Sequence, residues 1–301
     1  MQPLTGKIAV VAGATRGAGR GIACMLGEAG ATVYCTGRST RAARPEPGQA
    51  SSPFELKHRP ETIEETAELV NAYGGVGRPV RVDHTIEAEV KSLFERIKAE
   101  CGQLDLLVND VWGGDELSEW GQPFWELSLE KGWLMQERAV RSHIITNRYA
   151  APLMIEREQG LIIEITDGDN DQYRGNLFYD LVKQSVIRLA YAMAQELRPH
   201  HVTALALTPG FLRSEAMLEH FGVTEATWQD GAQKDPHFIA SETPFYIGRA
   251  VAALAADPNV AAKTGQVFSS WNLAQLYGFS DIDGRQPNWG KYFAEHVANQ
   301  G

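Results

Sequence analysis

A glycine-rich turn follows the first apolar stretch of the chain and strongly restricts the folds that the chain can adopt. Residues 7–12, Lys-Ile-Ala-Val-Val-Ala, have the composition of a short buried strand, and residues 20–29 place apolar side chains on one side of a helix. Segment 13–19, Gly-Ala-Thr-Arg-Gly-Ala-Gly, lies between them. Glycines allow a tight turn, and the unpaired N–H groups at a helix N-terminus bind anions. The pattern therefore predicts a strand–turn–helix unit that holds a phosphate group.

Short apolar stretches alternate with helical stretches along the rest of the chain. Near-continuous apolar strands between helices are typical of a parallel sheet that helices cover on both faces. We therefore expect an α/β fold with a doubly wound parallel sheet of about seven strands, in one domain over residues 1–301. The expected strands are residues 7–12, 31–36, 79–83, 104–109, 161–166, 201–208 and 266–269. The expected helices are residues 20–29, 61–73, 86–101, 131–158, 179–198 and 243–256.

Three long stretches, at about 38–60, 111–133 and 210–242, interrupt this alternation. Each follows an expected strand, and ligands of doubly wound sheets bind outside the carboxyl ends of the strands. The first is rich in Arg, Pro, Gly and Ser, whereas the other two are rich in aromatic residues, which predicts an apolar pocket under a mobile lid at 211–242. The alternative is a core or subunit-interface role for four tryptophans: Trp120, Trp125, Trp133 and Trp228.

The charge and the cysteines limit the partners that we expect. A net charge of −10 and a pI near 5.3 disfavour binding to nucleic acid or to an anionic membrane. The sequence contains no apolar run near the roughly 18 residues of a membrane span, and a strand is expected within seven residues of Met1, which leaves no room for a signal peptide. Cys24, Cys35 and Cys101 lack metal-site spacing. We therefore expect a reduced cytoplasmic protein without a metal.

Tyr179 and Lys183 lie four positions apart in an expected helix. Side chains with this spacing leave the same face of a helix, one turn apart. An ammonium group beside a phenol favours the phenolate, which predicts a lowered pKa for Tyr179 and a role in acid–base chemistry.

Together, these features resemble the short-chain dehydrogenase/reductase family over about residues 5–270. The resemblance depends on segment 12–19, on Val108-Asn109 at the end of the fourth expected strand, on Tyr179 and Lys183, and on Thr208-Pro209-Gly210. It implies a Rossmann-type sheet, a bound nicotinamide cofactor, a small-molecule substrate, and a homodimer or homotetramer.

The resemblance also implies roles for single residues. Tyr179 would be the proton donor or acceptor at the substrate oxygen, and Lys183 would hold the nicotinamide ribose and lower the pKa of Tyr179. Asp83 would contact adenine, and Asn109 would make a backbone contact on the ribose side. The residues expected to bind the cofactor are Gly13, Thr15, Arg16, Gly17, Ala18, Gly19, Arg38, Asp83, Asn109, Tyr179, Lys183, Pro209 and Gly210.

The end of the second expected strand bears on the choice of cofactor. An acidic side chain at this place would bind the ribose 2′-hydroxyl and repel a 2′-phosphate, but the chain has Gly37 there. Arg38 follows, and Arg16 lies in the glycine-rich turn. Because guanidinium groups suit phosphate recognition, we expect NADP(H) in preference to NAD(H).

The chain departs from the family where a serine normally polarises the substrate carbonyl at the end of the fifth strand. Spacing before Tyr179 selects Thr166, whereas alignment of the strand end selects Asp167. Thr166 has a hydroxyl donor, but an ionised Asp167 only accepts hydrogen bonds and would repel an oxyanion. The sequence leaves both candidates open.

Two further departures concern supporting residues. The family's helix asparagine is absent, and Glu137, Arg138 or Ser142 stands near its expected place, with His143 as either a proton-relay group or a packed helix residue. The usual Gly-Gly after the last strand is replaced by Ser269-Ser270.

The expected activity is that of an NADP(H)-dependent carbonyl reductase. It would transfer hydride between the nicotinamide and a carbonyl or secondary alcohol, with a bulky or aromatic ketone or aldehyde as substrate, Tyr179 as acid or base, and Thr166 or Asp167 as a further catalytic residue. Two alternatives stay open. The chain could bind NADP(H) without hydride turnover, as a sensor or structural partner, or it could perform lyase or epimerase chemistry with Asp167 as base.

Overall fold

A seven-stranded parallel sheet forms the centre of the computed structural model, which describes residues 2–43, 52–56 and 59–298. The strand order is β3-β2-β1-β4-β5-β6-β7. The inner strands are apolar runs that are almost entirely buried, as expected for strands covered on both faces. The strands are β1 (Ile8–Ala12), β2 (Thr32–Gly37), β3 (Val76–Arg81), β4 (Leu106–Asn109), β5 (Gly160–Ile165), β6 (Val202–Thr208) and β7 (Val267–Ser269).

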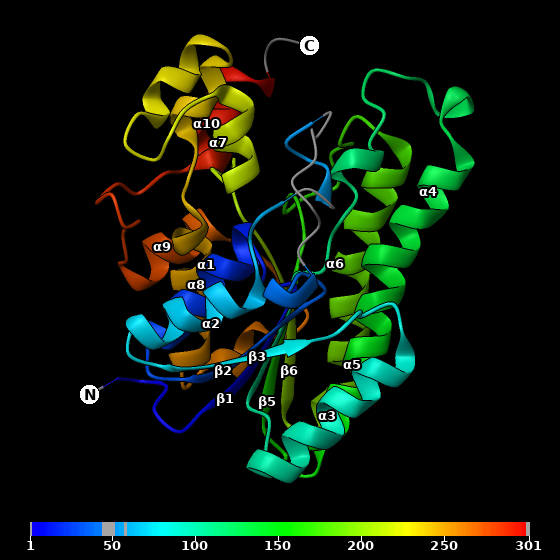
Figure 1. The fold of residues 1–301 in the computed structure, drawn as a ribbon, viewed down its shortest axis with the longest axis vertical. Coiled ribbons are helices and arrows are strands. Elements are labelled where there is room, and N and C mark those ends of the chain that lie inside the picture. Colours follow the sequence, from blue (N-terminus) through cyan, green and yellow to red (C-terminus); the bar gives the residue numbers. More distant parts are fainter. Residues whose placement is uncertain (1, 44–51, 57–58, 299–301) are drawn as a thin grey trace.

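Two layers of helices cover the sheet (Figure 1). One face packs against α1 (Gly17–Glu28), α2 (Ile63–Ala72) and α8 (Pro244–Ala256), and the other against α3 (Glu87–Cys101), α5 (Ser142–Ile155) and α6 (Leu177–Leu197). Each layer encloses its own apolar core, around Val11 and Ile22 on the first face and around Val10 and Phe94 on the second. The expected doubly wound α/β fold is therefore confirmed.

The order in which strands are added to the sheet reverses at β1: β2 and β3 lie on one side of this strand, and β4 to β7 lie on the other. This strand pairs with β2 on one side and with β4 on the other. The connections after β1 and β4 consequently diverge, which opens a crevice at the carboxyl ends of the two strands. The glycine-rich turn lies at this switch point.

Several element boundaries differ from those expected. The third strand runs over Val76–Arg81 instead of 79–83, because its register on β2 aligns Val76 with Thr32, and its edge position leaves it without the continuous apolar pattern of an inner strand. The helix expected over 131–158 consists of α4 (Leu129–Met135), a π-helical turn (Gln136–Arg141) and α5. Helix α6 begins at Leu177, because the Asn176 side chain accepts a hydrogen bond from the Tyr179 N–H and caps it.

The two aromatic insertions carry structure of their own. Residues 111–133 contain 3₁₀ turns at Asp115–Leu117 and Phe124–Glu126 before α4, and residues 210–242 contain α7 (Glu215–Phe221) and 3₁₀ helices at Trp228–Gln233 and Pro236–Ala240. Two further helices follow β7: α9 (Ser270–Tyr277) and α10 (Trp289–His296). Of the first of the three long stretches, at about 38–60, residues 44–51 and 57–58 lie outside the described residues.

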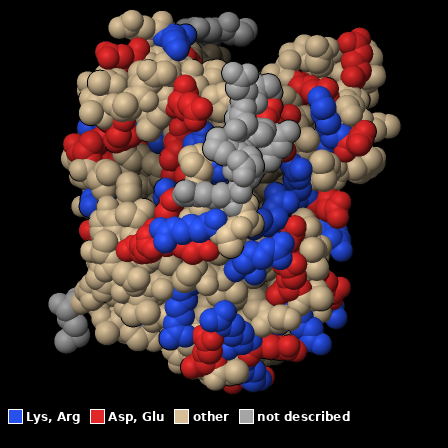
Figure 2. Space-filling view, viewed as in Figure 1, with Lys and Arg blue, Asp and Glu red and all other residues tan. Residues whose placement is uncertain are grey.

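Charged side chains of both signs are interspersed on the face drawn in Figure 2. Examples of ion pairs between neighbouring elements are Lys98–Glu156 at 2.7 Å and Arg78–Glu100 at 2.6 Å. Such exposed pairs contribute at most about 1 kcal/mol each. A search of the described residues for a helix long and apolar enough to span a bilayer finds none.

Candidate active site

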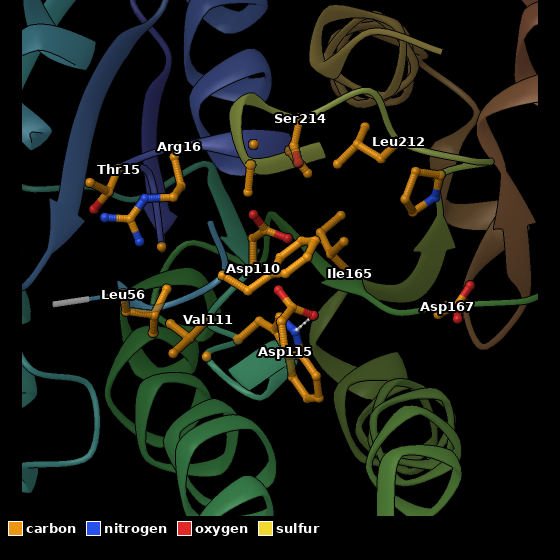
Figure 3. Close-up of a pocket in the computed structure, with 18 of the residues that line it drawn as sticks. Thr15, Arg16, Leu56, Asp110, Val111, Asp115, Ile165, Asp167, Leu212 and Ser214 are labelled. Carbon is orange, nitrogen blue, oxygen red and sulfur yellow. Dashed lines mark hydrogen bonds between the residues drawn. The ribbon is translucent and has the colours of Figure 1, made fainter. Parts of the chain in front are cut away.

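A pocket of about 650 Å³ lies at the carboxyl ends of the strands, above the switch point. Its wall runs from the glycine-rich turn, past the ends of β2, β4 and β5, to α6 and the lid at α7 (Figure 3). Most residues expected at the cofactor or the substrate meet in this pocket. They are Gly13, Thr15, Arg16, Gly17, Ala18, Arg38, Asp83, Thr166, Asp167, Tyr179, Lys183, Pro209 and Gly210.

Two residues expected to bind the cofactor do not line the pocket. Gly19 lies beneath the turn, where an added Cβ would come within 2.3 Å of the Gly13 carbonyl oxygen. Asn109 is fully buried, and its amide donates to Glu164 Oε1 at 2.8 Å. The neighbouring Asp110 faces the pocket instead, because successive residues of a strand point to opposite sides.

The glycine-rich turn already holds a carboxylate at the start of α1. Gly13 has φ +92°, and a Cβ there would lie 2.6 Å from the carbonyl oxygen of Asp110. The Gly17 N–H donates to Glu215 Oε2 of the lid helix at 2.8 Å. This carboxylate is a protein-borne anion at the site where a phosphate is expected, and it shows that the helix N-terminus binds negative charge.

Arginines gather where the adenosine end of a dinucleotide would lie. Arg16 Nε is 3.2 Å from Glu61 Oε2, and Arg38 is 3.7 Å from Asp83. Arg59, which the sequence did not single out, joins this group by pairing with Glu61 and with Glu219 of the lid. A Cβ on Gly37 would meet Thr15 Oγ1 at 2.6 Å, so a larger side chain at that position would require the Thr15 side chain to move.

Tyr179 lies in the pocket with its phenol turned to a carboxylate. Its hydroxyl donates to Asp167 Oδ2 at 2.8 Å. Burial and the Asp167 charge raise the pKa of Tyr179 well above its ordinary value. The expected lowering by Lys183 is therefore wrong for the chain without ligands. The Lys183 ammonium instead lies 4.0 Å from the centre of the Trp112 ring, and burial lowers its pKa.

Thr166 and Asp167 have different surroundings, although both line the pocket. The Thr166 hydroxyl donates to the Lys183 carbonyl oxygen at 2.8 Å and so anchors α6. Asp167 faces the Tyr179 hydroxyl, as the family's serine would. The geometry thus places Asp167, and not Thr166, beside the Tyr179 hydroxyl.

Comparison with known sequences identifies the family of the chain. The sequence model of the short chain dehydrogenase family matches residues 49–222. Dehydrogenase/reductase SDR family member 1 of Mus musculus is 37% identical over 288 residues, which cover 94% of this chain and 85% of the mouse protein. The chain belongs to the short-chain dehydrogenase/reductase family.

More distant members of this oxidoreductase family are also similar. The 3-oxoacyl-[acyl-carrier-protein] reductase FabG of Aquifex aeolicus is 27% identical over 221 residues, 70% of this chain and 76% of that protein. A short chain dehydrogenase from Mycobacterium thermoresistibile superposes with a TM-score of 0.75 over 95% of this chain and 92% of that structure, at 22% identity. The second likeness shows that the fold is shared.

The candidates for the missing family asparagine turn away from Lys183. The Ser142 hydroxyl donates to the Arg138 carbonyl oxygen at 2.6 Å, and Arg138 donates to the Gly113 carbonyl oxygen at 2.6 Å. Glu137 is exposed on the π-helical turn. His143 does reach this region, because it lines a small cavity of about 20 Å³ together with Lys183 and Asp110.

His143 is buried, and each of its ring nitrogens has a hydrogen-bond partner. Its Nε2 lies 3.0 Å from the Val111 carbonyl oxygen and its Nδ1 2.6 Å from Glu164 Oε2. A carbonyl oxygen only accepts, so the His143 Nε2–H donates to Val111. Asp110 is the third titratable group here, and burial raises its pKa to about 7. The cavity can hold one water between these groups and Lys183.

The aromatic insertion divides into two parts. The Trp112 and Trp120 rings pack against Tyr179, with ring centres 5.4 and 5.1 Å away. Trp125 and Trp133 are exposed, at 72% and 65%, and do not line the pocket. Trp228 is buried in the core of the lid, as the alternative interpretation expected.

A buried carboxyl group ties the lid to the sheet. Glu242 Oε2 accepts hydrogen bonds from the Gly210 N–H at 3.0 Å and from Ser270 Oγ at 2.6 Å. Burial raises the pKa of Glu242 to about 8. Ser270, which stands where the family has glycine, thereby gains a partner inside the fold.

Sequence reasoning missed several residues of the pocket. Asp110 could have been found, because it directly follows the family's strand-end asparagine. Asp115 and Glu215 lie inside the insertions, where no motif marks single positions. Trp289 comes from α10 and reaches the pocket only through the fold. In the described part of the chain, no cluster of three or more His, Cys, Asp or Glu residues could hold a metal ion.

Proposed function

We propose that the chain is an NADP(H)-dependent oxidoreductase that interconverts a carbonyl compound and a secondary alcohol. The observation that carries this proposal is the Tyr179 hydroxyl, which lies in one pocket with an anion-binding turn and the Lys183 ammonium. The family relationship supports dehydrogenase or reductase chemistry at this place.

The residues around the turn fit a phosphorylated dinucleotide. The Gly17 N–H, which now donates to the Glu215 carboxylate, would hold the pyrophosphate. Arg38 and Arg16 would pair with the 2′-phosphate, and position 37 is a glycine, so it carries no acid that would repel this phosphate. Lys183 would hold the nicotinamide ribose. The bound nicotinamide would supply or accept the hydride.

Residues of the chain would supply the acid–base chemistry. Tyr179 would give its phenolic proton to the substrate oxygen during reduction and take it back during oxidation. Lys183 would favour the phenolate once its ammonium turns from Trp112 toward the phenol. Thr166 would position Lys183 through its bond to the helix backbone, and Asp167 would contact the substrate directly.

The remaining wall of the pocket favours a bulky or aromatic ketone or aldehyde. Trp112, Phe211, Met217 and Trp289 line this part and offer apolar and aromatic surface.

Cofactor binding and turnover test the proposal together. Titration calorimetry should give a Kd for NADPH at least tenfold below that for NADH, and Arg38→Ala should remove most of this difference. Loss of NADPH absorbance with a panel of aromatic ketones should report turnover. Tighter binding of NADH would overturn the choice of cofactor, and binding without oxidation across the panel would favour an NADP(H)-binding protein without turnover.

Asp167 supports one second candidate, a lyase or epimerase that uses this carboxylate as base. The observation in its favour is the carboxylate beside Tyr179, where the family has a neutral donor. Substrate turnover without a change in NADPH absorbance, lost in Asp167→Asn but kept in Thr166→Ala, would favour it.

The resemblance also implies a homodimer or homotetramer. Sedimentation equilibrium of the purified chain should therefore give two or four times 33.1 kDa.

A further inference from the structure

A hydrogen-bond donor and an acceptor stand side by side on the substrate side of the pocket. The Tyr179 hydroxyl donates to Asp167 Oδ2 at 2.8 Å, and both residues line the pocket. Before Tyr179 can donate to a substrate oxygen, its hydroxyl must leave Asp167. The partly buried carboxylate then needs another donor, because an unpaired charged acceptor in a pocket is costly.

A substrate could meet both requirements with two adjacent atoms. Its carbonyl oxygen would accept from Tyr179, while an N–H or O–H group on the neighbouring carbon would donate to Asp167. Heteroatoms on adjacent carbons lie about as far apart, in a gauche arrangement, as two hydrogen-bonded oxygens. The Tyr179–Asp167 pair is therefore complementary to a carbonyl compound with a donor on the α-carbon.

The surrounding charges favour an ammonium group as this donor. Asp115 lines the same pocket, with Oδ1 accepting from Trp112 Nε1 at 2.6 Å, and it acts electrostatically on both Tyr179 and Lys183. The rings of Trp112 and Trp120 pack against Tyr179. Carboxylates beside aromatic faces bind organic cations. Figure 3 shows Asp115 in the middle of the pocket view and Asp167 farther along the wall.

The nearby arginines do not cancel this preference, because each is already engaged. Arg138 pairs with Glu116 at 2.9 Å and donates to the Gly113 carbonyl oxygen. Arg174 pairs with Asp180 at 2.9 Å and donates to the main-chain oxygen of Asp167. Lys183 carries one positive charge toward the pocket, against the two carboxylates of Asp115 and Asp167.

We propose that the substrate is an α-ammonium ketone or aldehyde, reduced to the vicinal amino alcohol, with Asp167 and Asp115 binding the ammonium group and Tyr179 binding the carbonyl oxygen. This assignment rests on the proposed function and names its substrate class. The reaction adds one hydride, from the cofactor, to the carbonyl carbon and one proton, from Tyr179, to the oxygen, and it leaves the ammonium unchanged.

The same assignment accounts for the departure from the family's serine. A neutral hydroxyl stabilises the oxyanion that develops during reduction, whereas a lone carboxylate repels it. An ammonium group between Asp167 and that oxygen makes the local charge positive and so stabilises the oxyanion. Burial raises the pKa of Asp115, and a bound ammonium would favour its ionised form, so that cation binding and ionisation support one another.

Three ketones of nearly equal shape test this proposal. They are 2-amino-1-phenylethanone, 2-hydroxy-1-phenylethanone and 1-phenyl-1-propanone, which place NH₃⁺, OH or CH₃ on the α-carbon. With the wild-type chain and NADPH near pH 7, kcat/KM for the ammonium ketone should exceed that for the methyl ketone at least tenfold. A hydroxyl ketone that is turned over faster than the ammonium ketone, or equal rates for all three, would overturn the proposal.

Variants locate the preference in the two carboxylates. Asp115→Asn should lower the ammonium-to-methyl ratio several-fold, and Asp167→Ser, which restores the family hydroxyl, should invert it in favour of the methyl ketone. Asp171→Asn removes an exposed carboxylate that does not line the pocket, and should leave the ratio as in the wild type. A ratio that Asp115→Asn and Asp167→Ser leave unchanged would overturn the assignment.

A binding measurement separates this proposal from the proposed function. Quenching of tryptophan fluorescence, with NADP⁺ present, can compare 2-amino-1-phenylethanol with 1-phenyl-1-propanol. Absent turnover of every ketone would count against the oxidoreductase function, whereas tighter binding of the amino alcohol would still support the ammonium site. Equal binding of the two alcohols would overturn the site irrespective of turnover.

Discussion

The two halves of the pocket are built in different ways. The half proposed to hold the cofactor depends on close main-chain contacts: a Cβ on Gly13 would come within 2.6 Å of the Asp110 carbonyl oxygen, and the Gly17 N–H holds a carboxylate. The substrate half consists of side chains from distant segments, such as Trp112, Asp167 and Trp289. Where the main chain must pass close to another atom, the sequence needs glycine, and this need is visible in the sequence. Where side chains form the wall of the pocket, single residues can be exchanged without moving the main chain.

This difference explains why the cofactor half follows the family and the substrate half departs from it. Replacing a crowded glycine forces the main chain to move, which costs stability at once. Exchanging the family's serine for Asp167 changes charge and hydrogen bonding but leaves the fold intact. Four variants test this contrast, from the largest expected effect to the smallest.

Tyr179→Phe tests whether the substrate half contains the reacting group. The variant lacks the phenolic proton, so kcat should fall by roughly 10²–10⁴-fold, the usual contribution of a positioned acid or base. Loss of NADPH absorbance with the best ketone gives kcat, and calorimetry should show nearly unchanged NADPH affinity. Full activity in this variant would contradict the assignment of Tyr179.

Gly13→Ala, compared with Gly6→Ala, tests the main-chain crowding of the cofactor half. Both glycines have positive φ, +92° and +80°, so each alanine costs about 1–2 kcal/mol of backbone strain. Only at position 13 does the new Cβ meet another atom, the carbonyl oxygen of Asp110, whereas nothing lies within 4 Å at position 6. Gly13→Ala should therefore lower the free energy of unfolding by about 1–3 kcal/mol more than Gly6→Ala. Urea unfolding measures both, and equal losses would show that the turn is not crowded.

Glu242→Gln tests whether the buried carboxyl group at the base of the lid has a raised pKa in the folded chain. Its pKa of about 8 in the folded chain lies above the ordinary glutamate value of about 4.3. Between these values the folded chain holds a proton that the unfolded chain has released, so its contribution to stability falls as pH rises, by about 1.4 kcal/mol per pH unit, until pH 8.

Glu242→Gln should remove this decrease of the free energy of unfolding with rising pH, since glutamine stays neutral. Unfolding by urea at pH 6 and pH 8 should show that the free energy of unfolding falls by roughly 1–3 kcal/mol more in the wild type than in Glu242→Gln over this range. Glu126→Gln, at an exposed position, serves as the matched control and should behave as the wild type. Equal slopes in the wild type and in Glu242→Gln would contradict the raised pKa.

Glu215→Gln tests the lid carboxylate that accepts from the Gly17 N–H. Replacing the carboxylate with a neutral amide weakens the hydrogen bond from the Gly17 N–H and removes a charge that repels phosphate. NADPH should then bind a few-fold more tightly, in keeping with about 0.3–1 kcal/mol for a charge at a helix terminus. Glu130→Gln makes the same change in net charge at an exposed site of α4. An affinity gain of the same size in this control would attribute the effect to net charge and not to the lid.

Much of the fold could be predicted because inner strands are apolar throughout and helices carry a periodic pattern. The edge strand β3 was misplaced, since a strand paired on only one side lacks the continuous burial that marks the others. The π-helical turn within residues 131–158 was missed, because it keeps the composition of an α-helix.

The candidate site was predicted unevenly. The turn, Tyr179 and Lys183 follow local spacing and meet as expected in one pocket. The pKa of Tyr179 was assigned the wrong direction, because the sequence places Lys183 one turn away but does not show that Asp167 lies closer to the phenol. Asp115, Glu215 and Trp289 were not found, since tertiary packing alone brings them to the pocket.

The sequence by itself determined the doubly wound fold, the family and the shared position of Tyr179 and Lys183 on one helix, because each depends on local periodicity, glycine positions or residue spacing along one helix. The tertiary structure decided which of Thr166 and Asp167 faces Tyr179, where the Lys183 ammonium lies, and that a lid carboxylate occupies the anion site. These are contacts between segments far apart in the chain. They depend on the direction in which a single side chain points at the end of a strand. Because successive side chains point to opposite faces of a sheet, a shift of one residue reverses that direction.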